Sequence, residues 1–215
     1  MFKIDWGKIL VIPIFTLLLV INIYGFLEKS KVFFPVASLK VIELIHQSLV
    51  IGFYGLLVLL YVFRHRAKST STSLAVNTAA LSATFLPFLI PLLNQKRLED
   101  PSVLIAGDLI ILFGMGLTIY ALLTLGRNLS IIPQARNLIQ NGPYRLIRHP
   151  LYAGELISVL GLILVHHNAS QVAAFFLLIG LQTYRAFQEE RLLSRMFAEY
   201  ESYSLKTYRF LPGVF

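Results

Sequence analysis

The sequence predicts an all-α protein that crosses a membrane several times, and three observations support this prediction. Hydrophobic residues make up 56% of the 215 positions, and the mean hydropathy is +0.70. Charged residues make up only 14%, whereas a soluble domain carries about 25%, so the chain has too few charges to cover a water-exposed surface. Apolar runs recur along the chain with the length of about 20 residues that a helix needs to span a bilayer.

We expect about five to six transmembrane helices, which are, in chain order, residues 9–27, 41–63, 74–93, 103–125, 151–167 and 170–186. The last two are separated only by a short polar turn and form a C-terminal helical hairpin, whose halves are short for simple spans. The first run is an alternative candidate for a cleaved signal peptide, but it is long and lacks a convincing small-residue cleavage site.

The segment that follows the hairpin predicts a further helix with two unlike faces. Its apolar and aromatic residues recur at helical spacing, at positions 192, 193, 196, 197, 200 and 203. The opposite face is polar and charged. We therefore expect a cytosolic amphipathic C-terminal helix that lies along the membrane surface or closes over the hairpin.

The distribution of positive charge predicts the orientation in the membrane. The net charge is +8, and if both termini are cytoplasmic, 14 Lys and Arg residues lie on the inside and 5 on the outside, the latter being Lys29, Lys31, Lys40, Lys96 and Arg97. This bias is typical of cytoplasmic loops. Nucleic-acid binding is not expected, since no basic aromatic motif is present. The absence of cysteine excludes disulfides and thiolate chemistry.

One stretch, GPYRLIRHPLYAGEL at residues 142–156, gathers cations, tyrosines and rigid turns at the start of an apolar run. Pro150 suits the first turn of a helix, whose unpaired N–H groups carry partial positive charge. With Arg145, Arg148 and His149 beside it, this turn predicts a site for a carboxylate or phosphate. Tyr144 and Tyr152 offer flat rings that could sandwich a heterocycle. The alternative is an ordinary juxtamembrane loop with snorkelling arginines and interfacial tyrosines.

A second group of charges follows the hairpin, where Arg185 precedes the pair Glu189 and Glu190. Carboxylates at this place are often only the solvated end of a helix. A functional interpretation requires a cationic ligand between these carboxylates and the cationic turn. A zwitterionic ligand would satisfy both groups.

Two segments carry a resemblance to a known family: LGRNLSIIPQARNLIQNGPYRLIRHPLYAGELISVLG at 125–161 and RAFQEERLLSRMFAEYESYSLKTYRFLP at 185–212. The pattern G-P-Y-R-x-x-R-H-P-x-Y-x-G, followed by R-x-x-x-E-E and a Y-x-x-Y tail, resembles the isoprenylcysteine carboxyl methyltransferase family. Related phospholipid methyltransferases pair a G-x-G with an E-E, and this chain has G-M-G at 114–116. A pair of small residues in a membrane helix is more typical of close helix packing.

The resemblance implies an S-adenosylmethionine-dependent membrane methyltransferase whose pocket faces the cytoplasm. It implies the following cofactor-binding residues: Gly142, Tyr144, Arg148, His149, Pro150, Tyr152, Gly154, Glu189 and Glu190. Arg185 is the candidate for orienting an acceptor carboxylate, and Glu155 is the candidate base if the acceptor is an amine or a thiol. The acceptor is expected to be a lipophilic small molecule or a prenylated cysteine. Residues 101–215 would form the catalytic region and residues 1–100 a region for packing and substrate.

Alternative functions remain open at this point. One is a membrane sterol or lipid reductase of related architecture that uses NAD(P)H, and another is methyl transfer to a lipid amine or small thiol. A non-catalytic protein such as a transporter subunit is a third, although no path of charged residues crosses the spans. Glu43 and His46 have helical spacing but lack further metal ligands, and no metal is expected.

Overall fold

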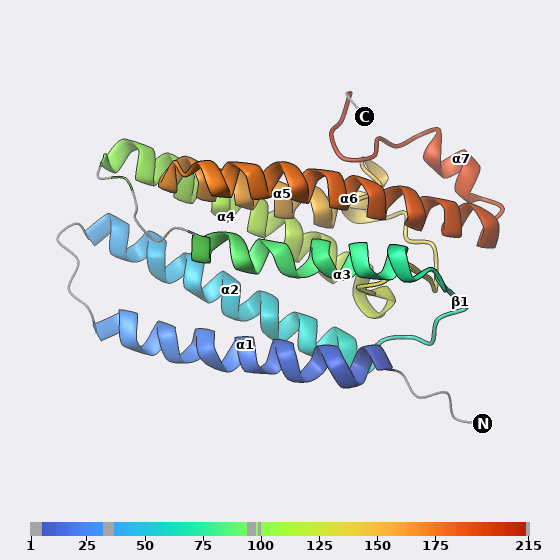
Figure 1. Cartoon of the computed structure of the whole chain (residues 1–215), viewed down its shortest axis with the longest axis horizontal. Coiled ribbons are helices and arrows are strands. Elements are labelled where there is room, and N and C mark those ends of the chain that lie inside the picture. The colour runs from blue at the N-terminus through green and yellow to red at the C-terminus, as the bar shows by residue number, and fades with distance from the viewer. Residues whose placement is uncertain (1–5, 32–36, 94–97, 99, 214–215) are drawn as a thin grey trace. The chain divides into compact units, whose positions relative to one another are not determined.

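The computed structural model describes residues 6–31, 37–93, 98 and 100–213, so Lys3, Lys96 and Arg97 of the charge count lie outside the described residues. The α-helices of this part are α1 (Trp6–Lys31), α2 (Ala37–Phe63), α3 (Leu74–Leu89), α4 (Pro101–Leu125), α5 (Pro150–His166), α6 (Ala169–Met196) and α7 (Tyr200–Ser204) (Figure 1). The shorter elements are the 3-10 helices η1 (Ile90–Leu93), η2 (Gly126–Asn128) and η3 (Gly142–Arg145) and the strands β1 (Ser69–Thr70) and β2 (Gln134–Ala135).

Four helical segments of the described chain are long and apolar enough to cross a membrane: Val11–Glu28, Lys40–Phe63, Leu74–Leu93 and Pro101–Asn128. Helix α5 is apolar but has only 17 residues. Helix α6 has 28 residues, and its last third carries several charges. The predicted all-α, polytopic membrane architecture with a C-terminal hairpin is confirmed, and the protein is an integral membrane protein.

Residues 1–64 form a compact unit built on the antiparallel pair α1 and α2 (Figure 1). Phe15 of α1 is almost fully buried and contacts the rings of Tyr54 and Tyr61 on α2. Gln47 of α2 donates a hydrogen bond of 3.0 Å to the side-chain oxygen of Asn22 on α1. Interhelical polar bonds of this kind help to hold membrane helices together, since the lipid tails supply no competing donors.

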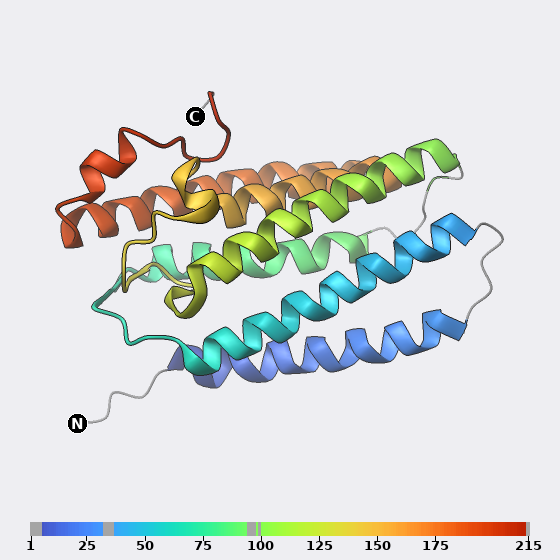
Figure 2. The ribbon, with the colours of Figure 1, turned by 180° about the vertical axis from the view of Figure 1, so that it is seen from behind.

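Residues 65–215 form the second compact unit, which contains α3 to α7 (Figures 1 and 2). Its closest helix pair is α4 with α5, and glycines allow the approach. A Cβ atom added at Gly114 would lie 2.6 Å from the carbonyl oxygen of Gly154, and the reverse distance is also 2.6 Å. Seven residues along each helix, a Cβ at Gly161 would lie 2.7 Å from the carbonyl oxygen of Gly107. Such small residues let two membrane helices meet backbone to backbone.

The hairpin of α5 and α6 packs on the end of α3 and on η1 through a cluster of the buried residues Ile90, Val159 and Leu178, with Leu86 of α3 against it. Its turn is well defined. His167 adopts a left-handed conformation with φ 44° and ends α5, and the side chain of Asn168 caps α6 by accepting hydrogen bonds from the N–H groups of Ser170 and Gln171. This capping satisfies donors that a helix start otherwise leaves unpaired.

The loops of the second unit gather at one end of its helices. Strand β1 precedes α3 and pairs antiparallel with β2, which follows α4. Figure 2 shows α7 and the segment between α4 and α5 at this same end. The C-terminal end of α4, the N-terminal end of α5 and the charged end of α6 therefore meet there.

The C-terminal segment differs from the single amphipathic helix that its pattern predicts. Helix α6 continues to Met196, breaks at Phe197, which has extended backbone, and is followed by the five-residue helix α7. Residues 205–209 then return as irregular chain to the start of α5, where Tyr208 forms a parallel bridge with Ile147. The contacts of this returning segment, rather than helical periodicity, determine its path.

Candidate active site

The turn before α5 has a backbone that its sequence dictates. Gly142 has φ 55°, a left-handed conformation that other residues rarely adopt, and a Cβ there would lie 2.9 Å from the hydroxyl of Thr124. Pro143 sits in the first turn of η3, and Pro150 sits in the first turn of α5. Between these prolines the chain presents Arg148 and His149 to the charged end of α6.

Glu190 is the centre of the first charge cluster of the site. Its Oε1 accepts hydrogen bonds from Arg148 Nε at 2.9 Å and Arg209 Nε at 2.9 Å, and it lies 3.1 Å from His149 Nε2. Its Oε2 accepts a second bond from Arg209 at 2.9 Å. The predicted meeting of the cationic turn and the acidic pair is therefore observed, 42 positions apart in the chain, but Glu190 is bonded to the protein itself.

The bonds around Glu190 determine its protonation. Burial alone would raise the pKa of this carboxyl, but hydrogen bonds from His149, Arg209 and Arg148 outweigh burial and hold the pKa well below its ordinary value of 4.5. Glu190 is therefore ionised at neutral pH. Its single negative charge faces two guanidinium groups, so this cluster keeps a net positive charge.

The cluster also fixes the C-terminal segment. Arg148 donates from NH1 to the carbonyl oxygens of Ser204 at 2.7 Å and Thr207 at 2.5 Å. The backbone N–H groups of Arg148 and His149 donate to the carbonyls of Tyr208 and Arg209. The segment that follows α7 is thus held against the motif turn by side-chain and backbone bonds together.

Glu189 belongs to a second cluster, one residue earlier on α6. Its Oε1 accepts a hydrogen bond of 2.5 Å from the Tyr152 hydroxyl and one of 3.1 Å from Arg185 Nε. Its Oε2 lies 3.9 Å from His149 Nδ1 and accepts no hydrogen bond from the described residues. Glu189 therefore keeps one carboxylate oxygen available, whereas both oxygens of Glu190 are bonded.

Tyr152 is packed by aromatic and cationic neighbours. The His149 ring stacks on it with a centroid distance of 5.3 Å and an interplanar angle of 8°, and the guanidinium of Arg185 lies 4.7 Å from its centroid. Two groups of the protein, the His149 ring and the Arg185 guanidinium, therefore already lie against the Tyr152 ring, where a heterocycle was expected to stack. Its hydroxyl, bonded to Glu189, positions that carboxylate.

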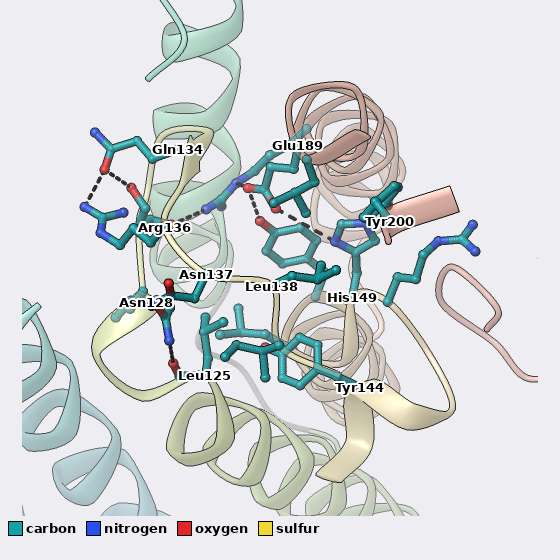
Figure 3. Close-up of a pocket in the computed structure, with 18 of the residues that line it drawn as sticks. Leu125, Asn128, Gln134, Arg136, Asn137, Leu138, Tyr144, His149, Glu189 and Tyr200 are labelled. Carbon is teal, nitrogen blue, oxygen red and sulfur yellow. Dashed lines mark hydrogen bonds and ion pairs between the residues drawn. The ribbon is translucent and has the colours of Figure 1, made fainter. Parts of the chain in front are cut away.

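A cavity of about 860 Å³, including its open mouth, lies at this end of the second unit. Figure 3 shows Gln134, Arg136 and Asn137 on one side of it and His149, Glu189 and Tyr200 on the other. Because this volume includes open solvent, the space is a pocket that is open on one side and not an enclosed cavity.

Six of the predicted site residues line this cavity: Tyr144, Arg148, His149, Tyr152, Arg185 and Glu189. The remaining predicted residues lie around it without lining it: Gly142, Pro150, Gly154, Glu155 and Glu190. Gly142 and Pro150 shape the turn, Glu190 fixes the turn to the tail, and Gly154 provides the close contact with α4. The two glycines of the G-M-G in α4 have different surroundings. Gly114 packs against Gly154, whereas a Cβ atom added at Gly116 would meet nothing within 4 Å.

Glu155, the candidate base, lies one turn further along α5 and accepts a hydrogen bond from Gln182 of α6. It stands near Arg185, which bonds to Glu189 rather than to Glu155. Glu155 thus bonds across the two helices of the hairpin and does not line the cavity.

Sequence reasoning missed one whole wall of the cavity, which comes from the segment between α4 and α5. Its lining residues are Leu125, Asn128, Leu129, Ser130, Ile132, Gln134, Arg136, Asn137, Leu138 and Ile139. The strand pair β1–β2 holds this segment, and Arg136 Nε donates 2.7 Å to the carbonyl of His65. Tyr200 and Tyr203 of α7 also line the cavity. Within the described residues, no group of three or more His, Cys, Asp or Glu side chains is arranged to hold a metal ion.

Comparison with known proteins identifies the class. Residues 102–200 match the family model described as phospholipid methyltransferase. Probable protein-S-isoprenylcysteine O-methyltransferases of Oryza sativa subspecies indica and japonica are each 29% identical over 168 residues, which is 73% of this chain and 88% of theirs. The cobalt-zinc-cadmium resistance protein CzcN of Cupriavidus metallidurans is 33% identical over 107 residues, 47% of this chain and 50% of that protein.

The helices and these matches together define an integral membrane methyltransferase. Within that class, the matches support a resemblance to the isoprenylcysteine carboxyl methyltransferases and to the related phospholipid methyltransferases. The family resemblance that the motifs indicated is confirmed.

Proposed function

We propose that this protein transfers a methyl group from S-adenosylmethionine to the carboxylate of a lipid-like acceptor such as a prenylated cysteine. The observation that carries the proposal is the lining of the cavity, to which the acidic residue Glu189 and the basic residues Arg148 and Arg185 all contribute. A ligand with both a cationic and an anionic group fits such a lining. The names of the Oryza relatives support a prenylcysteine acceptor.

The donor set suits the methyl donor on two counts. Glu189 keeps one oxygen for an ammonium or a ribose hydroxyl, while Tyr152 and Arg185 hold the other oxygen in place. The apolar residues Leu129, Ile132 and Leu138 line the same cavity and can exclude water from it. A pocket with mostly apolar walls and a few fixed polar groups is typical of cofactor sites.

Arg185 is the proposed anchor for the acceptor carboxylate. It donates to Glu189 from Nε, to the Thr84 hydroxyl from NH1 at 3.0 Å and to the Ser130 carbonyl from NH2 at 3.1 Å. Since a guanidinium has five N–H donors, two remain after these three bonds. The three bonds fix the orientation of the Arg185 guanidinium, and its two remaining N–H donors can orient an anionic group.

The reaction requires no proton transfer by the protein when the acceptor is a carboxylate. When bound, S-adenosylmethionine supplies a methyl group activated on a sulfonium, which the acceptor oxygen receives while the electron pair of the broken C–S bond stays on sulfur. A carboxylate is already ionised at neutral pH and needs no base. The protein has to align the reactants and exclude water. Because Glu155 is bonded to Gln182 and does not line the cavity, a carboxylate acceptor is favoured over an amine or a thiol.

The test uses the purified full-length protein in detergent. We expect S-adenosylhomocysteine to bind and to raise the melting temperature, and labelled methyl groups to appear in N-acetyl-S-farnesylcysteine. Mild base should release the label as methanol, since an ester is base-labile and an N-methyl or S-methyl product is not. A response to NADPH alone would favour the reductase alternative, and a base-stable product would favour an amine or thiol acceptor.

We further propose that the site faces the cytoplasm with both termini, and that residues 101–215 act as the catalytic region. The bias of positive charge supports this orientation. Because the chain has no cysteine, Ser194→Cys near the site and Ala169→Cys at the far end of α6 give a matched pair. In inverted vesicles, a membrane-impermeant maleimide should label only the former, and the opposite pattern would refute the orientation.

A further inference from the structure

Tyr200 combines two properties that rarely occur together in a folded protein. It is only 4% exposed and lines the cavity. Its hydroxyl is buried and has no hydrogen-bond partner among the described residues. Most buried polar side-chain atoms are hydrogen-bonded, and leaving one unbonded destabilises the protein. An unbonded buried hydroxyl on a residue that lines the cavity indicates that a ligand supplies its hydrogen-bond partner.

The neighbouring Tyr203 provides an internal comparison. It lies on the same short helix, and its ring meets that of Tyr200 edge-on with a centroid distance of 5.9 Å. Its hydroxyl donates a hydrogen bond of 2.8 Å to the backbone carbonyl of Tyr144. Tyr203 is therefore satisfied within the protein and fixes α7 to the motif turn, whereas the hydroxyl of Tyr200 is left for another group.

The charges around Tyr200 indicate which charge the ligand group that bonds to its hydroxyl should carry. Of the charged groups around it, the Glu190 carboxylate acts on this tyrosine most strongly, and Arg148 and Arg209 act in the opposite sense. Glu190 is itself bonded to both arginines, so the cluster as a whole carries a net positive charge. Burial raises the pKa of the Tyr200 hydroxyl, so it stays protonated at neutral pH and can donate. A donor beside a cluster of net positive charge is best matched by an anionic acceptor.

We infer that the Tyr200 hydroxyl, together with the Arg148 guanidinium, binds the carboxylate of the amino-acid part of the methyl donor. The available oxygen of Glu189 then serves the ammonium group of the same ligand. Tyr200 becomes a specificity-determining residue that distinguishes the complete methyl donor from adenosine compounds without a carboxylate. This inference rests on the proposed function.

The experiment compares full-length Tyr200→Phe and Tyr203→Phe with the natural protein in detergent. Calorimetry gives the Kd of S-adenosylhomocysteine and of its decarboxylated analogue. Hydrogen bonds to a charged group typically change affinity about tenfold to a hundredfold, so Tyr200→Phe should weaken S-adenosylhomocysteine by that factor. The decarboxylated analogue should bind the natural protein and Tyr200→Phe equally, because the group that the hydroxyl recognises is missing from it.

The melting temperature without ligand separates ligand recognition from a structural effect. Tyr200→Phe should melt at the same temperature as the natural protein or higher, since it removes an unbonded buried hydroxyl. Tyr203→Phe should melt lower, because it breaks the bond to Tyr144.

Three outcomes are decisive. Unchanged affinity of Tyr200→Phe for S-adenosylhomocysteine would overturn the inference and leave the proposed function intact. An equal loss for both ligands would overturn the assignment to the carboxylate. If the natural protein bound neither ligand, the proposed function itself would fail, and with it this inference.

Discussion

Glu189 and Glu190 are adjacent on α6, yet they face different parts of the molecule. Glu190 is bonded through both oxygens to the motif turn and the C-terminal segment and does not line the cavity. Glu189 lines the cavity and keeps one oxygen available. Successive residues of a helix point about 100° apart, so one carboxylate can serve assembly while its neighbour serves a ligand. An acidic pair in a sequence motif need not be a pair in function.

The largest expected effect comes from Glu190→Gln. This change leaves Arg148 and Arg209 without their buried counter-charge, and removing one partner of a buried ion pair typically destabilises a protein by about 3–5 kcal/mol. We expect a large fall in melting temperature and loss of the C-terminal segment's protection from protease. Glu201→Gln, at an exposed position of α7, is the matched control. A Glu190→Gln protein as stable as this control would contradict the structural assignment.

The next effect concerns the glycine contact of α4 and α5. Gly154→Ala would place a Cβ 2.5 Å from the Thr118 hydroxyl, and overpacking of this kind destabilises by about 1–3 kcal/mol. Gly116→Ala, with no atom within 4 Å, should leave stability equal or higher. Thermal unfolding measures both. Weaker ligand binding by Gly154→Ala at unchanged stability would instead make Gly154 a ligand contact, as the family resemblance implied.

Glu189→Gln should act on the ligand more than on the fold. It keeps the shape of the side chain but removes the charge that we assign to a cationic part of the ligand. Affinity for S-adenosylhomocysteine should fall about tenfold to a hundredfold, with a smaller loss of stability than Glu190→Gln. Equal losses of stability in the two variants, with equal ligand affinity, would remove the distinction between the two carboxylates.

Mild acid gives the smallest effect. Because the pKa of Glu190 is lowered in the folded protein, its contribution to stability is complete above pH 4.5, the ordinary value, and is lost as the pH falls towards the lowered value. The difference in unfolding free energy between the natural protein and Glu190→Gln should shrink by about 1.4 kcal/mol for each pH unit below 4.5. A difference that stays constant from pH 6 to pH 3.5 would show that the charge of Glu190 contributes no stability.

Much of the fold followed from the sequence, because apolar runs are a strong signal for membrane helices. The meeting of the cationic turn with the acidic pair was also predictable, since both lie at the same end of the C-terminal hairpin. Which carboxylate faces the cavity was not predictable. It depends on Arg209, which approaches Glu190 from a segment that no helical pattern describes.

The wall formed by residues 125–139 was hidden for a different reason. Most of its lining residues are leucines, isoleucines, asparagines and a glutamine, which are common outside functional sites. The β1–β2 pairing and the bond from Arg136 to the His65 carbonyl, which hold this segment, are not visible in the sequence. Tyr200 was visible as part of an aromatic pattern at helical spacing, but that pattern describes a face and not a ligand contact. A buried hydroxyl without a partner can be recognised only when the surroundings of each atom are known.

The hold of Arg148 on Ser204 and Thr207 links positions 56 and 59 residues apart. During synthesis, the motif turn leaves the ribosome well before these partners do. The hold on the motif turn can therefore form only after the segment beyond α7 has been made.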